Sequence, residues 1–157
     1  MGRIVKENYA FMGSRELKEF FRLIEKQYGK VPELFEKIAF IRGKERIFTI
    51  SRDVELIDMK NLRMNSIGLY IAEVKNGQLR LSIEGSQIIG PSATKNVCEL
   101  SEEQLKEWFK GNDLKIEGTY EGFVILKNGT DYVGSGKYRE GLIMNFVPKA
   151  RRLLEMH

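Results

Sequence analysis

The chain has 157 residues, of which 42% are hydrophobic and 31% charged, and its formal net charge is +4 with a pI near 9.1. This composition excludes a disordered chain. No apolar run approaches the 18 residues that a membrane helix needs, so we expect no membrane partner. The single cysteine, Cys98, excludes an internal disulfide and indicates a reducing, cytoplasmic location.

The first predicted helix begins at Ser14, which we expect to cap it, and ends before Gly29. Its apolar residues recur at helical spacing and predict one buried stripe. They are Leu17, Phe20, Phe21, Ile24 and Tyr28. We expect this stripe to be core and not a binding groove.

A hairpin follows, with strands over residues 38–42 and 46–51 around Gly43-Lys44. We expect Phe40, Ile47, Phe48 and Ile50 to face the helix. Residues 54–59 are apolar but too short to identify as helix or strand. Residues 1–64 are predicted to form a small α/β domain.

The second predicted domain, residues 65–157, opens with a strand over residues 68–74. Asn76-Gly77 indicates a tight turn because both residues tolerate positive φ, and a short strand then contains Leu79 and Leu81. Residues 83–89 fit two structures, a short helix capped by Ser82 or a continuation of the strand.

Residues 96–100 predict a strand, and the next four residues, Ser101 to Gln104, form a capping box that starts a helix. We expect Trp108 on its apolar side to anchor the core; a platform for stacking bases is the alternative. Gly111 ends this helix.

Short strands joined by tight turns make up the rest. Residues 123–126 and 132–133 flank Asn128-Gly129, and residues 137–139 and 142–147 flank Glu140-Gly141, with Pro148 ending the last strand. This spacing predicts a small barrel or sandwich. The chain as a whole is therefore expected to be α+β.

Residues 134–152 carry five cations and one acid, Glu140, a local charge of 5 − 1 = +4. A glycine-rich basic hairpin with a basic tail suits a polyanion such as RNA. A charged edge that only keeps the sheet from pairing with other chains explains the same charge.

Residues suited to catalysis are scarce. The only histidine is the terminal His157, and Cys98 has no histidine or second cysteine near it in sequence. We therefore expect no catalytic residue, no metal site and no cofactor.

Residues 68–152 resemble a PUA domain, specifically the PUA-like C-terminal module of the nucleolar-protein/Sun family of RNA cytosine-5 methyltransferases. The match rests on the Gly-led strand, the Asn-Gly turn and a Ser-capped helix. It rests further on Gly134-Ser135-Gly136-Lys137 and on Asn145-Phe-Val-Pro148-Lys149 followed by arginines. Where bacterial members have Pro-Ser-His, this chain has Leu81-Ser82-Ile83.

The resemblance implies a PUA-like pseudo-barrel that docks ribosomal or transfer RNA, in RNA modification or ribosome biogenesis. Asn145 would read a base edge or a 2′-hydroxyl. The cations expected to contact phosphates are Lys137, Arg139, Lys149, Arg151 and Arg152, with Arg80 and Lys95 completing the face.

The family's catalytic domain has no counterpart in this sequence, so the resemblance implies RNA binding without methyl transfer, as in stand-alone archaeal proteins grouped with the family. The alternative is an accessory module that binds a separate RNA methyltransferase or ribosome-assembly protein. An enzyme of unfamiliar type would have only Cys98 as its nucleophile.

Overall fold

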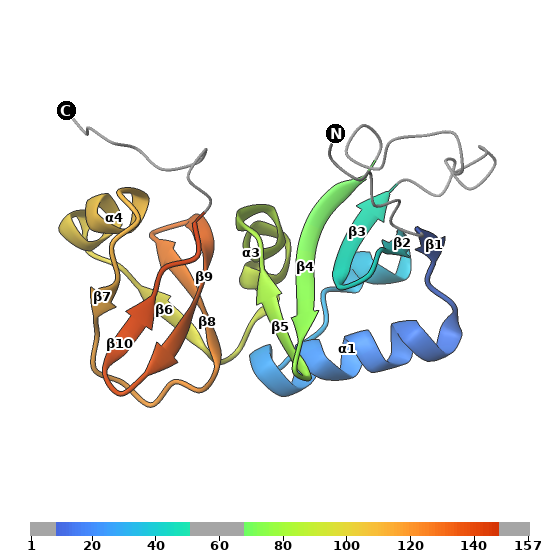
Figure 1. Cartoon of the computed structure of the whole chain (residues 1–157), viewed down its shortest axis with the longest axis horizontal. Coiled ribbons are helices and arrows are strands. Elements are labelled where there is room, and N and C mark those ends of the chain that lie inside the picture. The colour runs from blue at the N-terminus through green and yellow to red at the C-terminus, as the bar shows by residue number, and fades with distance from the viewer. Residues whose placement is uncertain (1–8, 51–67, 148–157) are drawn as a thin grey trace, which may run out of the picture.

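The computed structural model describes residues 9–50 and 68–147, and within them the fold is α+β, as expected. Two five-stranded sheets stand side by side, with helix α3 between them (Figure 1). The first sheet has the strand order β1-β2-β3-β4-β5, and the second has the order β6-β8-β9-β10-β7. None of the helices in these residues is long and apolar enough to cross a membrane.

Helix α1 (Ser14–Tyr28) confirms the first predicted helix. Its cap differs from the prediction: Gly13 is the extended residue before the helix, and its carbonyl accepts from the backbone N–H of Leu17. Ser14 is therefore the first helical residue and not the cap. Gly29 ends the helix with φ 91°, a conformation that glycine adopts without strain.

The first sheet is antiparallel throughout. Its strands are β1 (Ala10–Phe11), β2 (Ala39–Arg42), β3 (Arg46–Ile50), β4 (Leu69–Lys75) and β5 (Gln78–Leu81), and a 3₁₀ turn, η1 (Glu33–Glu36), precedes β2. The expected hairpins are confirmed. Asn76 and Gly77 both have positive φ, at 52° and 73°.

The expected orientation of the β2–β3 hairpin is only half right. Phe40 and Ile47 pack in the core beneath α1. Phe48 and Ile50 lie on the other face of the sheet, in a small separate cluster with Ile41. Alternation along the strand, with an irregularity between Ile47 and Phe48, sends them there.

Residues 83–89 form a helix, α3 (Ile83–Ile89), followed by the 3₁₀ turn η4 (Gly90–Ser92). Ser82 caps the helix, because its Oγ accepts from the N–H of Gly85 at 2.9 Å. A side chain at Gly85 would collide with the carbonyl of Ile71 on β4. Glycine at this position therefore lets α3 lie directly against the first sheet.

The second half contains β6 (Val97–Glu99), α4 (Glu102–Phe109), β7 (Leu114–Lys115), β8 (Phe123–Asn128), β9 (Asp131–Arg139) and β10 (Leu142–Met144). The capping box of α4 is confirmed by reciprocal bonds between Ser101 and Gln104. Trp108 is fully buried, and its Nε1 donates to the carbonyl of Val133 at 3.0 Å. It is the expected core anchor.

Three features of this sheet differ from expectation. Residues 131–139 form one nine-residue strand, where we expected two short ones. Strand β10 ends at Met144, because the backbone N–H of Asn145 leaves the ladder and donates to Asp113. The expected pseudo-barrel is not closed: in the described residues, β6 and β7 are the edges of an open sheet.

The predicted division between residues 64 and 65 lies outside the described residues and stays a prediction, as does the structure of residues 54–59. On its two sides, β3 and β4 pair antiparallel, so the first sheet contains strands from both predicted domains. The core beneath α1 also includes Ile125 from β8. A second core lies between the second sheet and α4.

Hydrogen bonds join the two halves. Ser135 Oγ on β9 accepts from the N–H of Leu81 and donates to its carbonyl, both at 3.0 Å. The buried hydroxyl of Tyr28 donates to the carbonyl of Phe123 at 3.1 Å. These bonds hold the end of β5 against β9 and fix the position of Arg80 relative to the second sheet.

Candidate nucleic-acid interface

The two faces of the second sheet differ in character. Val124, Leu126 and Ile143 point toward α4 and are fully buried. Their neighbours along the same strands point to the opposite face, because side chains alternate along a strand. Near β6 and β8 this opposite face is covered by the first half of the molecule, where Ile125 joins the core beneath α1.

Toward β10 and β7 the opposite face carries two rows of side chains. In one row, Lys137 is paired with Phe123 on one side and Met144 on the other. In the next, Leu142 is paired with Arg139 and Lys115. Paired residues project from the same face of a sheet. We call the surface made by Lys115, Lys137, Arg139, Leu142 and Met144 the open sheet face.

The cations of the open sheet face are available to a ligand. Lys115 and Arg139 are exposed and Lys137 is half-buried. The Lys137 ammonium lies 5.9 Å from the centre of the Phe123 ring. Within the described parts of the chain, no carboxylate lies within ion-pair distance of these three side chains. Their positive charge is therefore not neutralised by a direct partner there.

Arg80 on β5 lies beside this face. Its guanidinium is 5.2 Å from the centre of the Phe146 ring, and the centres of the Phe146 and Phe123 rings are 5.9 Å apart. Arg80 also pairs with the buried carboxylate of Glu73 at 2.9 Å, and 30% of its side chain remains exposed. Glu73 therefore offsets part of the Arg80 charge while holding the guanidinium in place.

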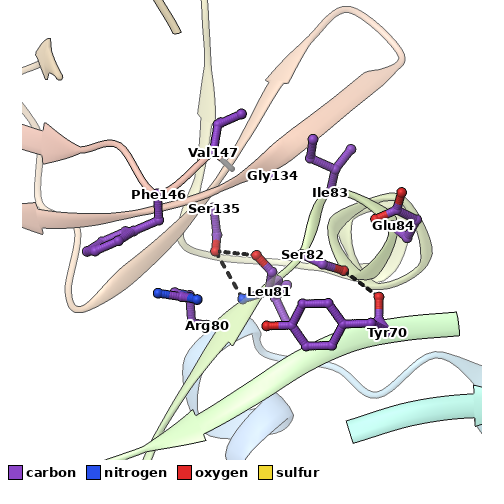
Figure 2. A pocket seen from close by; sticks show the side chains of 10 residues that line it. All are labelled: Tyr70, Arg80, Leu81, Ser82, Ile83, Glu84, Gly134, Ser135, Phe146 and Val147. Atoms are coloured by element: carbon purple, nitrogen blue, oxygen red, sulfur yellow. Dashed lines mark hydrogen bonds between the residues drawn. The ribbon is translucent and has the colours of Figure 1, made fainter. Parts of the chain in front are cut away.

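A cleft of about 90 Å³ opens between the two halves at this point. Figure 2 shows Arg80 and Phe146 on one side of it and the Ser135–Leu81 hydrogen bonds at its centre. The cleft is lined mostly by apolar surface. Burial raises the pKa of the Tyr70 hydroxyl, so this lining residue stays neutral at physiological pH.

Of the predicted RNA contacts, Lys137 and Arg139 lie on the open sheet face, and Arg80 lies next to Phe146, whose ring contacts the Phe123 ring beneath Lys137. Lys95 is exposed next to Gly29, before β6, on the far side of β8 from β9 and β10. The other three predicted phosphate contacts, Lys149, Arg151 and Arg152, lie outside the described residues.

Asn145 is engaged inside the protein. Its side-chain amide donates to the carbonyls of Trp108 at 2.7 Å and Asn112 at 3.0 Å. Its Oδ1 accepts from the N–H of Val147 at 2.7 Å. Both amide hydrogens are thus used, which leaves no donor free to read a base in this conformation.

Two residues of this region were missing from the expected set. Lys115 lies on a two-residue strand, too short for alternation to show in the sequence. Phe146 stands inside the Asn145-to-Lys149 motif but carried no predicted role. Its exposure, 40%, is a property of the fold.

Two kinds of reaction centre can be compared with the described residues, a nucleophilic cysteine and a metal site. Cys98 is 3% exposed, and burial raises the pKa of its thiol, which favours the unreactive protonated form. Over residues 9–50 and 68–147, no three His, Cys, Asp or Glu side chains are grouped so that they could hold a metal ion.

The second sheet thus has one face covered by α4, and the uncovered part of its other face carries cations and apolar side chains. Residues 95–153 match the family model of the methyltransferase RsmF PUA domain. The chain thus resembles the PUA-like module of the Sun/RsmF family. The match begins after β4 and β5, the strands that we assigned to the start of the module.

Individual relatives agree with this resemblance. The ribosomal RNA small subunit methyltransferase F of Vibrio cholerae is 30% identical over 89 residues, which cover 56% of this chain and 19% of the relative. The Aeromonas hydrophila protein of the same name is 29% identical over 153 residues, covering 94% of this chain and 30% of the relative. The chain therefore spans less than a third of the length of these relatives.

Proposed function

We propose that this protein binds RNA through the open sheet face and Arg80, and that its ligand is ribosomal RNA. The observation that carries the proposal is the gathering of Lys115, Lys137 and Arg139 on one face without carboxylate partners in the described residues. Lysine and arginine side chains bind phosphates, and the apolar residues between them suit the bases. The two relatives, named as ribosomal RNA methyltransferases, support the choice of RNA.

The proposed role is to bind RNA and not to transfer a methyl group. The matched family model is that of a PUA domain, and the described residues offer a buried thiol and no grouped metal ligands. Methyl transfer would then be carried out by a different segment or protein. The proposed site of action is the cytoplasm, where a lone cysteine stays reduced.

Lys149, Arg151 and Arg152 are proposed as further phosphate contacts, and Lys95 is proposed as a contact for RNA that extends past β8. Asn145 is proposed to position the end of β10, because its amide is committed to backbone groups. Arg80 would contribute through the exposed part of its guanidinium. Phosphate contacts give affinity and register but little sequence choice, so specificity would come from RNA shape or a few base contacts.

The test is the salt dependence of binding. For single-stranded RNA, each phosphate contact contributes about −0.7 to the slope of log affinity against log salt concentration. Replacing Lys137 and Arg139 by alanine should therefore flatten the slope by roughly 1.4. The matched control is Lys18→Ala with Lys26→Ala, which removes two exposed cations from α1. An equal effect of both pairs would show that binding is delocalised and would refute this interface.

A second candidate function is an accessory module that binds an RNA methyltransferase or ribosome-assembly protein. A separate groove of about 420 Å³ favours it, between α1 and the β2–β3 hairpin, with Phe20, Leu23 and Ile47 among its lining residues. A partner of this kind should co-purify after ribonuclease treatment. Loss of every partner on ribonuclease treatment would leave RNA binding as the function.

A further inference from the structure

Phe146 is an aromatic residue that is not buried in either core. It follows β10 by two residues and is 40% exposed, although a phenylalanine ring is among the side chains that gain most from burial. Its neighbours on both sides behave differently: Asn145 bonds to three backbone groups, and Val147 is buried. The backbone is therefore anchored on each side of an outward-facing ring.

The contacts of the ring leave part of it free. Phe123 lies 5.9 Å away with its plane tilted by 52°, and the Arg80 guanidinium is 5.2 Å from the ring centre. Lys137 lies over Phe123. The exposed ring thus lines the cleft between the two halves, with Arg80 beside it and with Phe123, which carries Lys137, on another side.

We propose that Phe146 is a stacking platform for one unpaired nucleobase of the RNA, with the neighbouring phosphates held by Lys137 and Arg80. This inference rests on the proposed RNA binding and adds the conformation of the ligand. An aromatic ring with a cation beside it is the arrangement on which single-stranded nucleic acids stack, and every base has a face that can use it. The mostly apolar lining of the cleft suits the apolar face of such a base.

Stacking on Phe146 selects single strands, loops and bulges over duplex. In a double helix both faces of each base are covered by the bases above and below, so the ring has no face to contact. The basic residues alone do not make this distinction, because phosphates are present in both forms. Loss of the ring should therefore reduce the preference for single-stranded over double-stranded RNA. This preference can be measured separately from the affinity for either form.

The experiment compares Phe146→Ala, Phe146→Leu and Phe146→Tyr with the unchanged protein. The probes are a single-stranded RNA 12-mer containing 2-aminopurine and a duplex formed from the same strand. Phe146→Ala should weaken single-strand binding by roughly 5- to 150-fold, with the salt slope unchanged. Duplex binding should change little, the change in 2-aminopurine fluorescence that accompanies single-strand binding should be lost, and Phe146→Tyr should retain both this change and the affinity.

Two results would overturn the inference. One is a Phe146→Ala protein, folded by circular dichroism, that binds the single strand within about twofold of the unchanged protein. The other is a Phe146→Leu protein, which has apolar volume but no ring, that keeps the full fluorescence change and affinity. If Lys137→Ala with Arg139→Ala still weakens binding in either case, the proposed RNA interface stands and only the stacking role fails. If that pair also has no effect, the proposed function fails with it.

Discussion

At the scale of single residues, Asn145 shows how a motif residue can act through structure. Its side chain joins the end of β10 to the end of α4 and the loop after it, through the carbonyls of Trp108 and Asn112. The same residue sets the path of the chain into Phe146. Asn145, which the sequence predicts as a ligand contact, thus supports the backbone beside the proposed RNA-binding surface.

Replacing Asn145 by alanine should therefore lower the free energy of unfolding by about 1–3 kcal/mol, because several hydrogen bonds with backbone groups are lost. Urea denaturation followed by the fluorescence of Trp108 measures this directly. Asn145→Asp should also destabilise, since a carboxylate cannot donate to the two carbonyls. A variant of normal stability with weakened RNA binding would instead favour the base-reading role.

At the scale of elements, β9 lies unusually close to β10 and to the Trp108 side chain. Gly136 lies in the middle of the strand, and a Cβ there would stand 2.5 Å from Ile143 Cγ2, 2.7 Å from the carbonyl oxygen of Met144 and 2.9 Å from Trp108 Cη2. The Gly-Ser-Gly sequence thus serves packing of the strand against Trp108 and β10. The sequence predicts that these three residues separate two short strands, but in the structure they lie within the single strand β9.

Gly136→Ala should destabilise the protein by about 1–3 kcal/mol, because the methyl group overpacks a site bounded partly by backbone. Thermal unfolding measured by circular dichroism would show the loss. Gly129→Asn is the matched control: nothing lies within 4 Å of a Cβ at Gly129, and asparagine tolerates its φ of +62°. Equal melting temperatures for the Gly136→Ala and unchanged proteins would contradict this account of β9.

Local sequence patterns are sufficient to predict most of the helices, strands and turns. The stripe from Leu17 to Tyr28, the capping box at Ser101 and the Asn76-Gly77 turn are each complete within a few residues, and all three were confirmed. Strand β7 was missed because Leu114 and Lys115 become a strand only by pairing with β10. The open sheet face was only partly predictable for the same reason, since β7 supplies Lys115 from outside the basic stretch.

At the scale of the whole molecule, the two halves form one unit. Ser135 is 4% exposed and satisfies both backbone groups of Leu81, while Asn96 donates to the carbonyl of Gln27 on α1. The cleft with Arg80 and Phe146 exists only where the halves meet. The part of the proposed interface that Arg80 and Phe146 form therefore depends on contacts that neither half supplies alone.

Ser135→Ala should leave the N–H and the carbonyl of Leu81 without that partner and lower the free energy of unfolding by about 2–4 kcal/mol. Unfolding should remain one transition in both proteins, with Trp108 fluorescence reporting the second half and far-ultraviolet circular dichroism reporting both. Separate transitions for the two signals would show that the halves unfold independently. Ser135→Thr, which keeps the hydroxyl, distinguishes loss of the hydrogen bonds from a change in packing.

The placement of Ile125 in the core beneath α1 has a practical consequence for dissecting this protein. A fragment cut at residue 95, where the family match begins, would keep β8 but lose the apolar partners that cover Ile125. The apolar surface around Ile125 would be exposed to water, and the fragment would lack Arg80. Truncation at a boundary taken from sequence similarity would thus remove the residues against which the matched segment packs. Aggregation or loss of RNA binding in such a fragment would therefore not test RNA recognition by the whole chain.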